Sequence, residues 1–395
     1  MTGVIHISLT SPIPPCYLEF QFKGKEYTYW IERRTNGKTT RTYRYVGNTQ
    51  VCKVRYNMMK WDFPLNSGGY SIPFTFQTPT GIPGSFYYTL GSTQAMIYYS
   101  VYGKLISNTE KLKGKTRVNI NQNPSSYKTN INITKNAKLS TWCCSPKGIL
   151  TMQVHWPQDT YSPSQLIECL LEIDNSQCKL PVTSVTAKLY YNLRILCNEG
   201  MHHFSSEVLL NANFDRQVQP GEKAMGQNSI RMQLDISSMR NKISNLHTTH
   251  GKLIECAFLI EVKAQTNGSC MCCGDSSSIT SNFVIVPDNI SPLAQVVIPT
   301  GWSPQIYNTV SMVYDSRYEV GPSGNYNINQ PQGYVQANNI PSYDQIAPVV
   351  DYRNNLQIAP SYETVVKNSQ RIEEINNTTA IEPYLENIDN PGMKE

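Results

Sequence analysis

The chain has 395 residues, of which 16% are charged, and it contains 25 tyrosines against 10 phenylalanines. That length suffices for two domains and a tail, and the composition favours strands over helices. No apolar run approaches the roughly 18 residues of a membrane span and no signal segment opens the chain, so we expect a cytoplasmic protein that reaches membranes only peripherally.

Charge is distributed unevenly along the chain. Residues up to Trp302 include 29 lysines and arginines against 18 acidic residues, whereas residues from Ser303 onward include 5 against 11. A basic body attracts acidic membrane surfaces or phosphorylated partners over long range, and an ordinary soluble surface is the equal alternative. No basic stripe is interleaved with aromatic residues, so no nucleic-acid partner is expected.

Alternation with a period of two predicts strands from the start of the chain. Apolar residues alternate in Ile5–Leu9 and again in Leu18–Phe22, which predicts a hairpin whose chain turns at Gly24. The clearest strand has Ile72, Phe74 and Phe76 two apart, with a glycine turn before it and a proline-glycine exit after it. These patterns predict a β-sandwich domain over residues 1–120.

A second sandwich is predicted after a polar segment. Residues 121–140 are Asn-rich with no apolar face, which predicts an interdomain linker. Residues 141–302 return to alternation, so the chain is predicted to be all-β, with two antiparallel immunoglobulin-like sandwiches of about seven strands each. The predicted strands of the second domain are Leu150–Trp156, Ile167–Ile173, Val185–Ile195, Ile230–Ile236, Ile254–Val262 and Phe283–Val286.

Two ordered sets of motifs resemble the arrestin-domain-containing (α-arrestin) family. In the first domain a glycine turn is followed by the strand Ser71–Phe76 and the exit Ile82–Phe86. The second domain has, in order, Cys143-Cys144, Gly148–Val154, Tyr161-Ser162-Pro163 and Leu171–Ser176, although the family's Gly and Glu after the proline are replaced by Ser164 and Gln165. The likeness spans residues 3 to about 302 and implies arrestin N-type and C-type sandwiches.

The resemblance leaves the family's usual first strand without a counterpart. Gly3–Ile7 corresponds to an internal strand in the family's order. In the visual and β-type arrestins the first strand helps to sense receptor phosphates, so that phosphate sensor is not carried over to this chain.

The resemblance implies a non-enzymatic adaptor at the plasma membrane or endosomes. The sandwiches would engage membrane-protein cargo, and the tail would recruit endocytic or ubiquitin-ligase machinery. The alternative is a structural subunit of a membrane-trafficking coat with an arrestin-like fold, as in retromer. No Gly-rich phosphate loop, nucleophile elbow or H-E-x-x-H motif indicates catalysis.

Residues 303–395 are predicted to be a disordered tail with tyrosine motifs, because they are rich in Asn, Gln, Pro, Ser and Tyr and show little alternation. An extended peptide can place an aromatic ring and an aliphatic side chain in two pockets, and clathrin adaptors read such signals. Three tyrosines have an aliphatic residue three places on: Tyr307 with Val310, Tyr343 with Ile346, and Tyr362 with Val365.

Two tail segments also resemble the P-P-x-Y ligands with which α-arrestin tails recruit WW-domain ubiquitin ligases. They are Pro341-Ser342-Tyr343 and Pro360-Ser361-Tyr362, in which Ile340 and Ala359 replace the first proline, so part of the groove contact is lost. The complete match Pro14-Pro15-Cys16-Tyr17 leads directly into a predicted strand, and we interpret it as structural.

Two cysteine clusters raise the question of a metal site. Cys143 and Cys144 open the second domain, and Cys270, Cys272 and Cys273 occupy a turn between its last two long strands. These positions lie at the same end of an immunoglobulin-like sandwich, so the thiols can converge. Three alternatives stay open: free thiols, a structural zinc site, and palmitoylation at a membrane. No other motif requires a cofactor.

A short basic stretch ends the first domain. Lys111, Lys113, Lys115 and Arg117 lie two apart, so they share one face of a strand. Such a face can contact anionic lipid, and the alternative is an ordinary solvated strand end.

Overall fold

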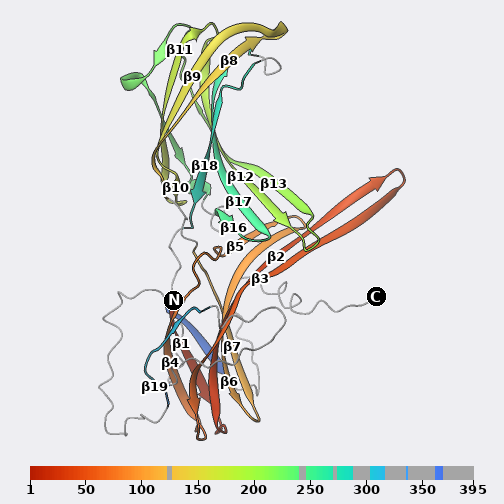
Figure 1. Ribbon diagram of the computed structural model, residues 1–395, viewed down its shortest axis with the longest axis vertical. Coiled ribbons are helices and arrows are strands. Elements are labelled where there is room, and N and C mark those ends of the chain that lie inside the picture. Colours follow the sequence, from red (N-terminus) through yellow and green to blue (C-terminus); the bar gives the residue numbers. More distant parts are fainter. Residues whose placement is uncertain are drawn as a thin grey trace.

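The computed structural model describes residues 1–121, 127–239, 246–269, 274–287 and 303–315, apart from the side chains of Cys143 and Met239, and the backbone of residues 335–336 and 361–367. Two β-sandwiches follow one another along the long axis of the molecule (Figure 1), and the predicted all-β, antiparallel two-domain fold is confirmed. No helix in this part of the chain is long and apolar enough to cross a membrane. Its helical segments are three short 3-10 turns: η1 (Trp142–Cys144), η2 (Gly226–Asn228) and η3 (Ser237–Met239).

The first sandwich joins two sheets through aromatic rings. One sheet has the order β19-β4-β1-β22 with β20 also on β4, and the other has the order β21-β3-β2-β6-β5 with β7 also on β6. Four of these strands come from the C-terminal part of the chain: β19 (Gln305–Ile306), β20 (Val310–Val313), β21 (Val335–Gln336) and β22 (Ser361–Lys367). Phe74 and Phe76 of the predicted core strand meet Phe20 with ring centroids 5.1 and 5.2 Å apart, at the tilted angles that aromatic pairs prefer. The strands are β1 (Thr2–Leu9), β2 (Cys16–Asn36), β3 (Thr39–Trp61), β4 (Gly68–Gln77), β5 (Phe86–Leu90), β6 (Thr93–Ser107) and β7 (Lys111–Val118).

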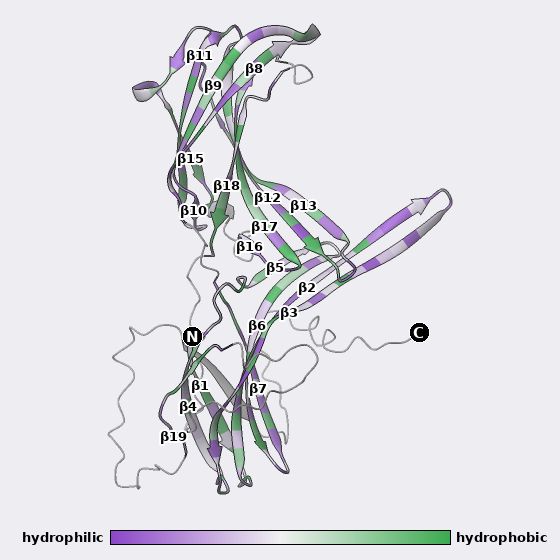
Figure 2. Ribbon diagram, in the orientation of Figure 1, coloured by the Kyte–Doolittle hydropathy of each residue, from purple (hydrophilic) through white to green (hydrophobic). Residues whose placement is uncertain are grey.

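β2 and β3 form a much longer hairpin than the one the sequence predicted. The prediction that Gly24 turns the chain is wrong, because β2 continues to Asn36 and β1 lies in the opposite sheet. Gly24 instead lies at a register shift, where a Cβ atom would collide with the ring of Tyr99. Glycine is needed there for close packing rather than for a turn. The far half of the hairpin projects from the body (Figure 1) and is mostly hydrophilic (Figure 2).

The second sandwich is built in the same way. Its sheets have the orders β14-β11-β9-β8, with β15 on β11, and β10-β18-β17-β12-β13, with β16 on β17. Trp156 and Phe283 pack edge to face between them, with ring centroids 4.8 Å apart. The strands are β8 (Thr129–Thr141), β9 (Ser145–Gln158), β10 (Thr160–Tyr161), β11 (Leu166–Cys178), β12 (Val182–Leu196), β13 (His202–Phe214), β14 (Lys223–Ala224), β15 (Ile230–Asp235), β16 (Thr249–His250), β17 (Ile254–Thr266) and β18 (Ser278–Ile285).

The predicted linker is largely a strand. Residues 129–141 form β8, which pairs antiparallel with β9 at the edge of the second sandwich. Ala137 and Leu139 are buried, and Ile131 and Ile133 are partly buried on the same side, so an apolar face exists between the asparagines and threonines. The prediction of a linker over 121–140 is therefore wrong for this part, because an edge strand needs only one thin apolar stripe.

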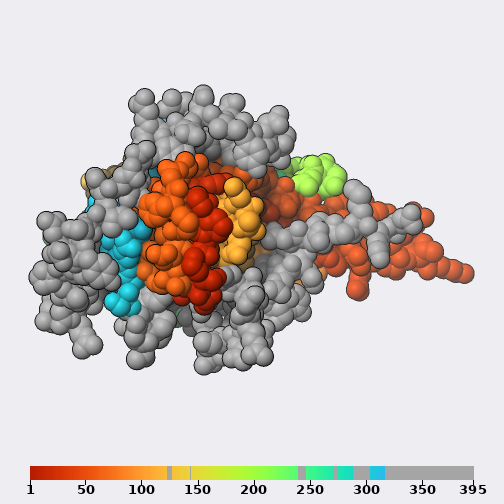
Figure 3. Space-filling view, turned by 90° about the horizontal axis from the view of Figure 1, so that it is seen from below, coloured from red at the N-terminus to blue at the C-terminus, as the bar shows by residue number. Residues whose placement is uncertain are grey.

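The first part of the predicted disordered tail belongs to the first sandwich. Residues 305–306 (β19) and 310–313 (β20) pair in parallel with β4, and Figure 3 shows this segment in cyan alongside the first domain. Val310 and Met312 are 8% and 7% exposed. The prediction of disorder is wrong for residues 303–315. The backbone of this segment pairs along the edge of β4, and its alternating apolar side chains are buried. Two further tail strands, β21 (Val335–Gln336) and β22 (Ser361–Lys367), pair with β3 and β1.

Candidate functional site

The outer surface of the β3-β2-β6-β7 sheet is the most basic surface of the first domain. Alternation sends Phe20, Phe22, Val101 and Leu105 into the core, so the residues between them face outward. The outward cations, which we call the basic face, are Lys23 and Lys25 on β2, Lys53 and Arg55 on β3, Lys104 on β6, and Lys111, Lys113, Lys115 and Arg117 on β7.

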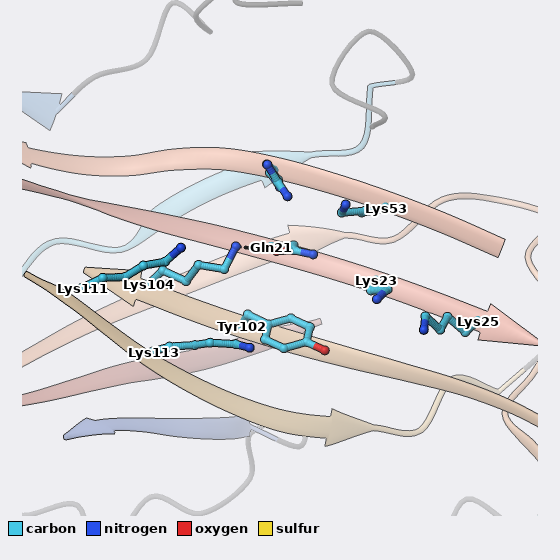
Figure 4. Close-up of a pocket in the computed structure, with 9 residues that line it drawn as sticks. Gln21, Lys23, Lys25, Lys53, Tyr102, Lys104, Lys111 and Lys113 are labelled. Carbon is cyan, nitrogen blue, oxygen red and sulfur yellow. Dashed lines mark hydrogen bonds between the residues drawn. The ribbon is translucent and has the colours of Figure 1, made fainter. Parts of the chain in front are cut away.

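The basic face is hollowed at its centre. An open hollow of about 490 Å³ is lined by seven of these cations together with Gln21 and Tyr102. Figure 4 shows the lysine side chains rising from neighbouring strands around Gln21 and Tyr102. The predicted lipid-contact residues Lys111 and Lys113 line the hollow, whereas Lys115 and Arg117 continue the same face of β7 beyond it.

A partly buried ion pair involves Lys104 of the hollow. The Lys104 ammonium donates to the carboxylate of Glu19 and to the amide oxygen of Gln21, each at 2.5 Å. Burial lowers the pKa of Lys104, the bond to Glu19 opposes that effect, and the neighbouring Arg55 and Lys111 lower the pKa further. The Glu19 carboxylate is thus engaged by Lys104.

Tyrosine rings hold the cations of β7 in place. The Lys113 and Lys115 ammonium groups lie 5.0 and 5.8 Å from the centroid of the Tyr102 ring, and the Arg117 guanidinium lies 5.5 Å from that of Tyr98. These cation–π contacts fix long side chains on a rigid sheet and leave their charge at the surface. From the sequence, only the cations of β7 were predicted to share a face. The other cations were missed because only strand pairing brings β2, β3 and β6 beside it.

The first tail motif is docked on the first domain. Tyr307 packs edge to face on Trp61 with ring centroids 5.9 Å apart, and its hydroxyl accepts a bond from the Trp61 indole at 3.1 Å. Val310 is buried against β4. In the structure this tyrosine motif is packed on the first domain, so its use as a sorting signal stays a prediction that requires release of the segment.

The other tail motifs are placed only in part. Tyr362 and Val365 lie in β22, whose backbone runs parallel to β1 with Tyr362 opposite Gly3 and Val365 opposite His6. β22 therefore occupies the edge of β1 that β4 leaves open. Pro341, Tyr343, Ile346 and Pro360 lie outside the described residues.

Described residues next to the two cysteine clusters meet in the second sandwich. Gly274, just after the second cluster, lies against Ser140 of β8, and Asp275 exchanges hydrogen bonds with Lys138. Cys144 is disulfide-bonded. Cys270, Cys272, Cys273 and the side chain of Cys143 lie outside the described residues, so the structural zinc site stays a proposal that requires Cys144 to be reduced. The described residues bring no three His, Cys, Asp or Glu side chains together as metal ligands.

Cysteine labelling separates the disulfide from the free thiol at Cys144. We expect Cys144, which lies in an exposed turn, to resist iodoacetamide in the native oxidised protein and to react fully after reduction. Mass spectrometry of the peptide containing residues 139–147 reports this. Buried Cys169, with a thiol pKa raised by burial, is the unreactive control in both native samples. Full labelling of Cys144 before reduction would contradict the disulfide.

The two domains meet around a buried carboxylate. Glu26 on β2 is 1% exposed, and its oxygens accept bonds from the backbone nitrogens of Lys252 and Leu253 at 2.9 and 2.7 Å. Nearby, the Thr28 hydroxyl donates to the Leu196 carbonyl at 2.5 Å. These bonds join the base of the long hairpin to the second domain.

A buried histidine lies in the same interface. His247 is 3% exposed and packs edge to face on Phe86 of β5, with ring centroids 5.8 Å apart. Burial lowers its pKa to about 4. A single buried position between two domains has no periodic signal.

The motifs of the second domain have clear structural roles. Gly148 adopts a φ of 104°, and a Cβ atom there would collide with the carbonyl oxygen of Gln177. Asn175 is fully buried, and its amide donates to the carbonyls of Leu180, Val218 and Gln219 at 3.0–3.1 Å. Both residues tie β11 to its neighbours, so these motif positions shape the sandwich.

Comparison with known families agrees with this architecture. Residues 1–120 match the family model of the arrestin (or S-antigen) N-terminal domain, and residues 146–289 match that of the arrestin (or S-antigen) C-terminal domain. No curated protein matches the chain. Arrestin-family proteins are generally adaptors and not enzymes. The two matches lie in the expected order, coincide with the two sandwiches and together cover more than half of the 395 residues, so the chain belongs to the arrestin family.

Proposed function

We propose that this chain is an adaptor of the α-arrestin type, which links membrane-protein cargo to endocytic sorting or ubiquitin-ligase machinery. The observation that carries the proposal is the path of the tail. After the second domain the chain returns to the first sandwich through β19 and β20, and the Pro-Ser-Tyr motifs follow this anchor. Machinery recruited by the tail is thereby held close to whatever the sandwiches bind.

The second tail motif has a competitor within the molecule. Tyr362 and Val365 belong to β22, which pairs with β1. A partner that reads this motif as an extended strand has to displace β22. We therefore infer that binding through Tyr362 and Val365 requires the release of β22 from β1.

Replacing both Tyr343 and Tyr362 by alanine should lower the recovery of a WW-domain ubiquitin ligase or a clathrin-adaptor subunit at least tenfold in a pull-down. The loss follows from removing both aromatic anchors that such pockets take. The matched control is Tyr318→Ala with Tyr326→Ala, because neither tyrosine has an aliphatic residue three places on. Unchanged recovery with the first pair would refute the tail role.

The alternative is a structural coat subunit that works without its tail. Gel filtration of a chain without its tail distinguishes the adaptor from the coat subunit. The deletion should begin after Asp315, so that β20 is kept. Removing β20 as well would take Val310 and Met312 off the first sandwich and break the hydrogen bond from the Tyr56 hydroxyl to the Val313 carbonyl. A fixed hetero-complex that survives removal of residues 316–395 would favour the coat subunit.

A further inference from the structure

The second sandwich has a long free edge at β13 (Figure 1). β13 lies at the end of the order β10-β18-β17-β12-β13, and among the described strands only β12 pairs with it. A bulge at Leu209 interrupts that pairing, so the regular part of the edge is His202–Val208. This part presents a row of backbone N–H and C=O groups that β12 does not use.

Other edges of the described sheets are protected in the ways that natural proteins use against unwanted pairing. β4 is covered by β19 and β20, β1 is covered by β22, and the end of β18 is covered by β10. β3, β7 and β8 contain five, four and two lysines or arginines. β13 contains no lysine, arginine or proline and a single carboxylate, that of Glu207. The described strands therefore leave this edge open to another strand.

Two large apolar side chains are exposed along the same edge. Phe204 is 69% exposed and Val208 is 51% exposed. They lie opposite Arg194 and Tyr190 of β12, which alternate with buried residues, so Phe204 and Val208 share the outer face of the sheet. Exposed apolar side chains beside an open strand edge indicate a surface that another chain covers.

The first domain holds this edge strand in place. The His203 ring stacks on Trp30 at the base of the long hairpin, with ring centroids 5.8 Å apart. The hydroxyl groups of Ser205 and Tyr88 share a hydrogen bond at 2.9 Å. Both contacts use the inner face of β13, so the outer face and the edge stay accessible. A strand that is already fixed in its extended form loses little conformational freedom when another strand pairs with it.

The pattern of side chains along the edge is self-complementary. Phe204 and Val208 each lie two residues from Ser206. When two copies pair antiparallel about a two-fold axis at Ser206, each residue lies opposite the residue equally far on the other side of the axis. Phe204 of each copy is then opposite Val208 of the other, and aromatic and β-branched residues form favourable cross-strand pairs. This symmetry favours a second copy over an unrelated peptide, for which such spacing has no purpose.

We propose that the free edge of β13 pairs with the same edge of a second copy about a two-fold axis at Ser206, so that the two second sandwiches share one continuous sheet. The dimer has two first sandwiches and two tails, which under the proposed function raises the avidity for clustered membrane cargo. The pairing requires neither Tyr343 nor Tyr362, so its test does not depend on the tail motifs.

Disulfide trapping in the full chain tests the register. Residues directly opposite one another in an antiparallel pair have Cα atoms about 4.5–5.5 Å apart, which a disulfide can bridge. Mild oxidation of Ser206→Cys should therefore give at least about ten times more covalent dimer than oxidation of the parent chain. The matched control is Asn211→Cys, an exposed position of β13 beyond the bulge and far from the axis. Equal crosslinking of both variants would indicate random collision and would overturn the pairing.

Sedimentation equilibrium measures the association without a crosslink. The parent chain should approach twice the mass of one chain as its concentration rises to about 100 μM. Ser206→Lys should raise the dissociation constant at least about 30-fold, because it places two like charges opposite one another at the axis. Asn211→Lys makes the same charge change on the same strand and should raise the dissociation constant less than about threefold. Equal effects of the two lysines would overturn the axis at Ser206.

The same measurement on a chain without residues 316–395 distinguishes a second copy from the chain's own tail as the occupant of the edge. The shortened chain should associate as strongly as the parent, because β13 belongs to the second sandwich. A parent chain that stays monomeric while the shortened chain dimerises would assign the edge to the tail. A chain that stays monomeric in both forms would overturn pairing between copies.

Discussion

Replacing Glu26 by alanine should loosen the contact between the two domains by about 3 kcal/mol. The buried carboxylate accepts two backbone hydrogen bonds from Lys252 and Leu253, and hydrogen bonds to a charged group are each worth about 1.5–3 kcal/mol. Alanine leaves both N–H groups unpaired in a closed interface. Hydrogen exchange of these two amides should accelerate about 100-fold.

The control for this prediction is an exposed carboxylate in the second domain. Glu255 pairs with Arg194 at 2.5 Å, but both side chains are about 40% exposed. Glu255→Ala should cost less than about 1 kcal/mol, because surface ion pairs contribute little. Unchanged protection of Lys252 and Leu253 in Glu26→Ala would show that this carboxylate does not hold the domains together.

Protein stability should fall as the pH drops from about 6.5 toward 4, because of His247. Burial lowers the pKa of this imidazole from 6.5 to about 4 in the folded protein. The unfolded chain therefore binds a proton that the folded chain excludes, so the stabilisation is complete above pH 6.5 and is lost progressively below it. A shift of this size corresponds to about 3 kcal/mol.

Chemical denaturation at intervals between pH 7 and pH 4 measures this effect. His247→Leu should flatten the slope in that window, because leucine is apolar, similar in size and does not titrate. His202→Asn, on the exposed start of β13, is the control and should leave the slope unchanged. A parent protein with the same slope as His247→Leu would show that the histidine is not the titrating group.

Sequence patterning located the core strands but not the segments that complete the sheets. Ile72, Phe74 and Phe76 were predicted as a buried face, and all three are at most 2% exposed. β8 and β20 were missed because they are edge strands, in which a few apolar residues alternate with polar ones that face solvent. A window that averages hydropathy reads such a strand as a linker or a tail.

The basic face was likewise predicted only in part from the sequence. The cations of β7 were predicted to share a face, since spacing along one strand is a local property. Lys23, Lys53 and Lys104 come from positions far apart in the chain and join β7 only through the pairing of β2 with β3 and β6. The hollow therefore could not be predicted from any single stretch of sequence.

The sequence by itself determined that this chain forms two β-sandwiches, because strand alternation and stiff exits are local properties of the backbone, and the order of its motifs carried the resemblance to arrestin domains. Tertiary structure decided where the tail docks, which histidine is buried, which carboxylate joins the domains and which lysines face one another. Those outcomes depend on register and on contacts between distant segments, since a one-residue shift of a strand would send the same side chains to the opposite face.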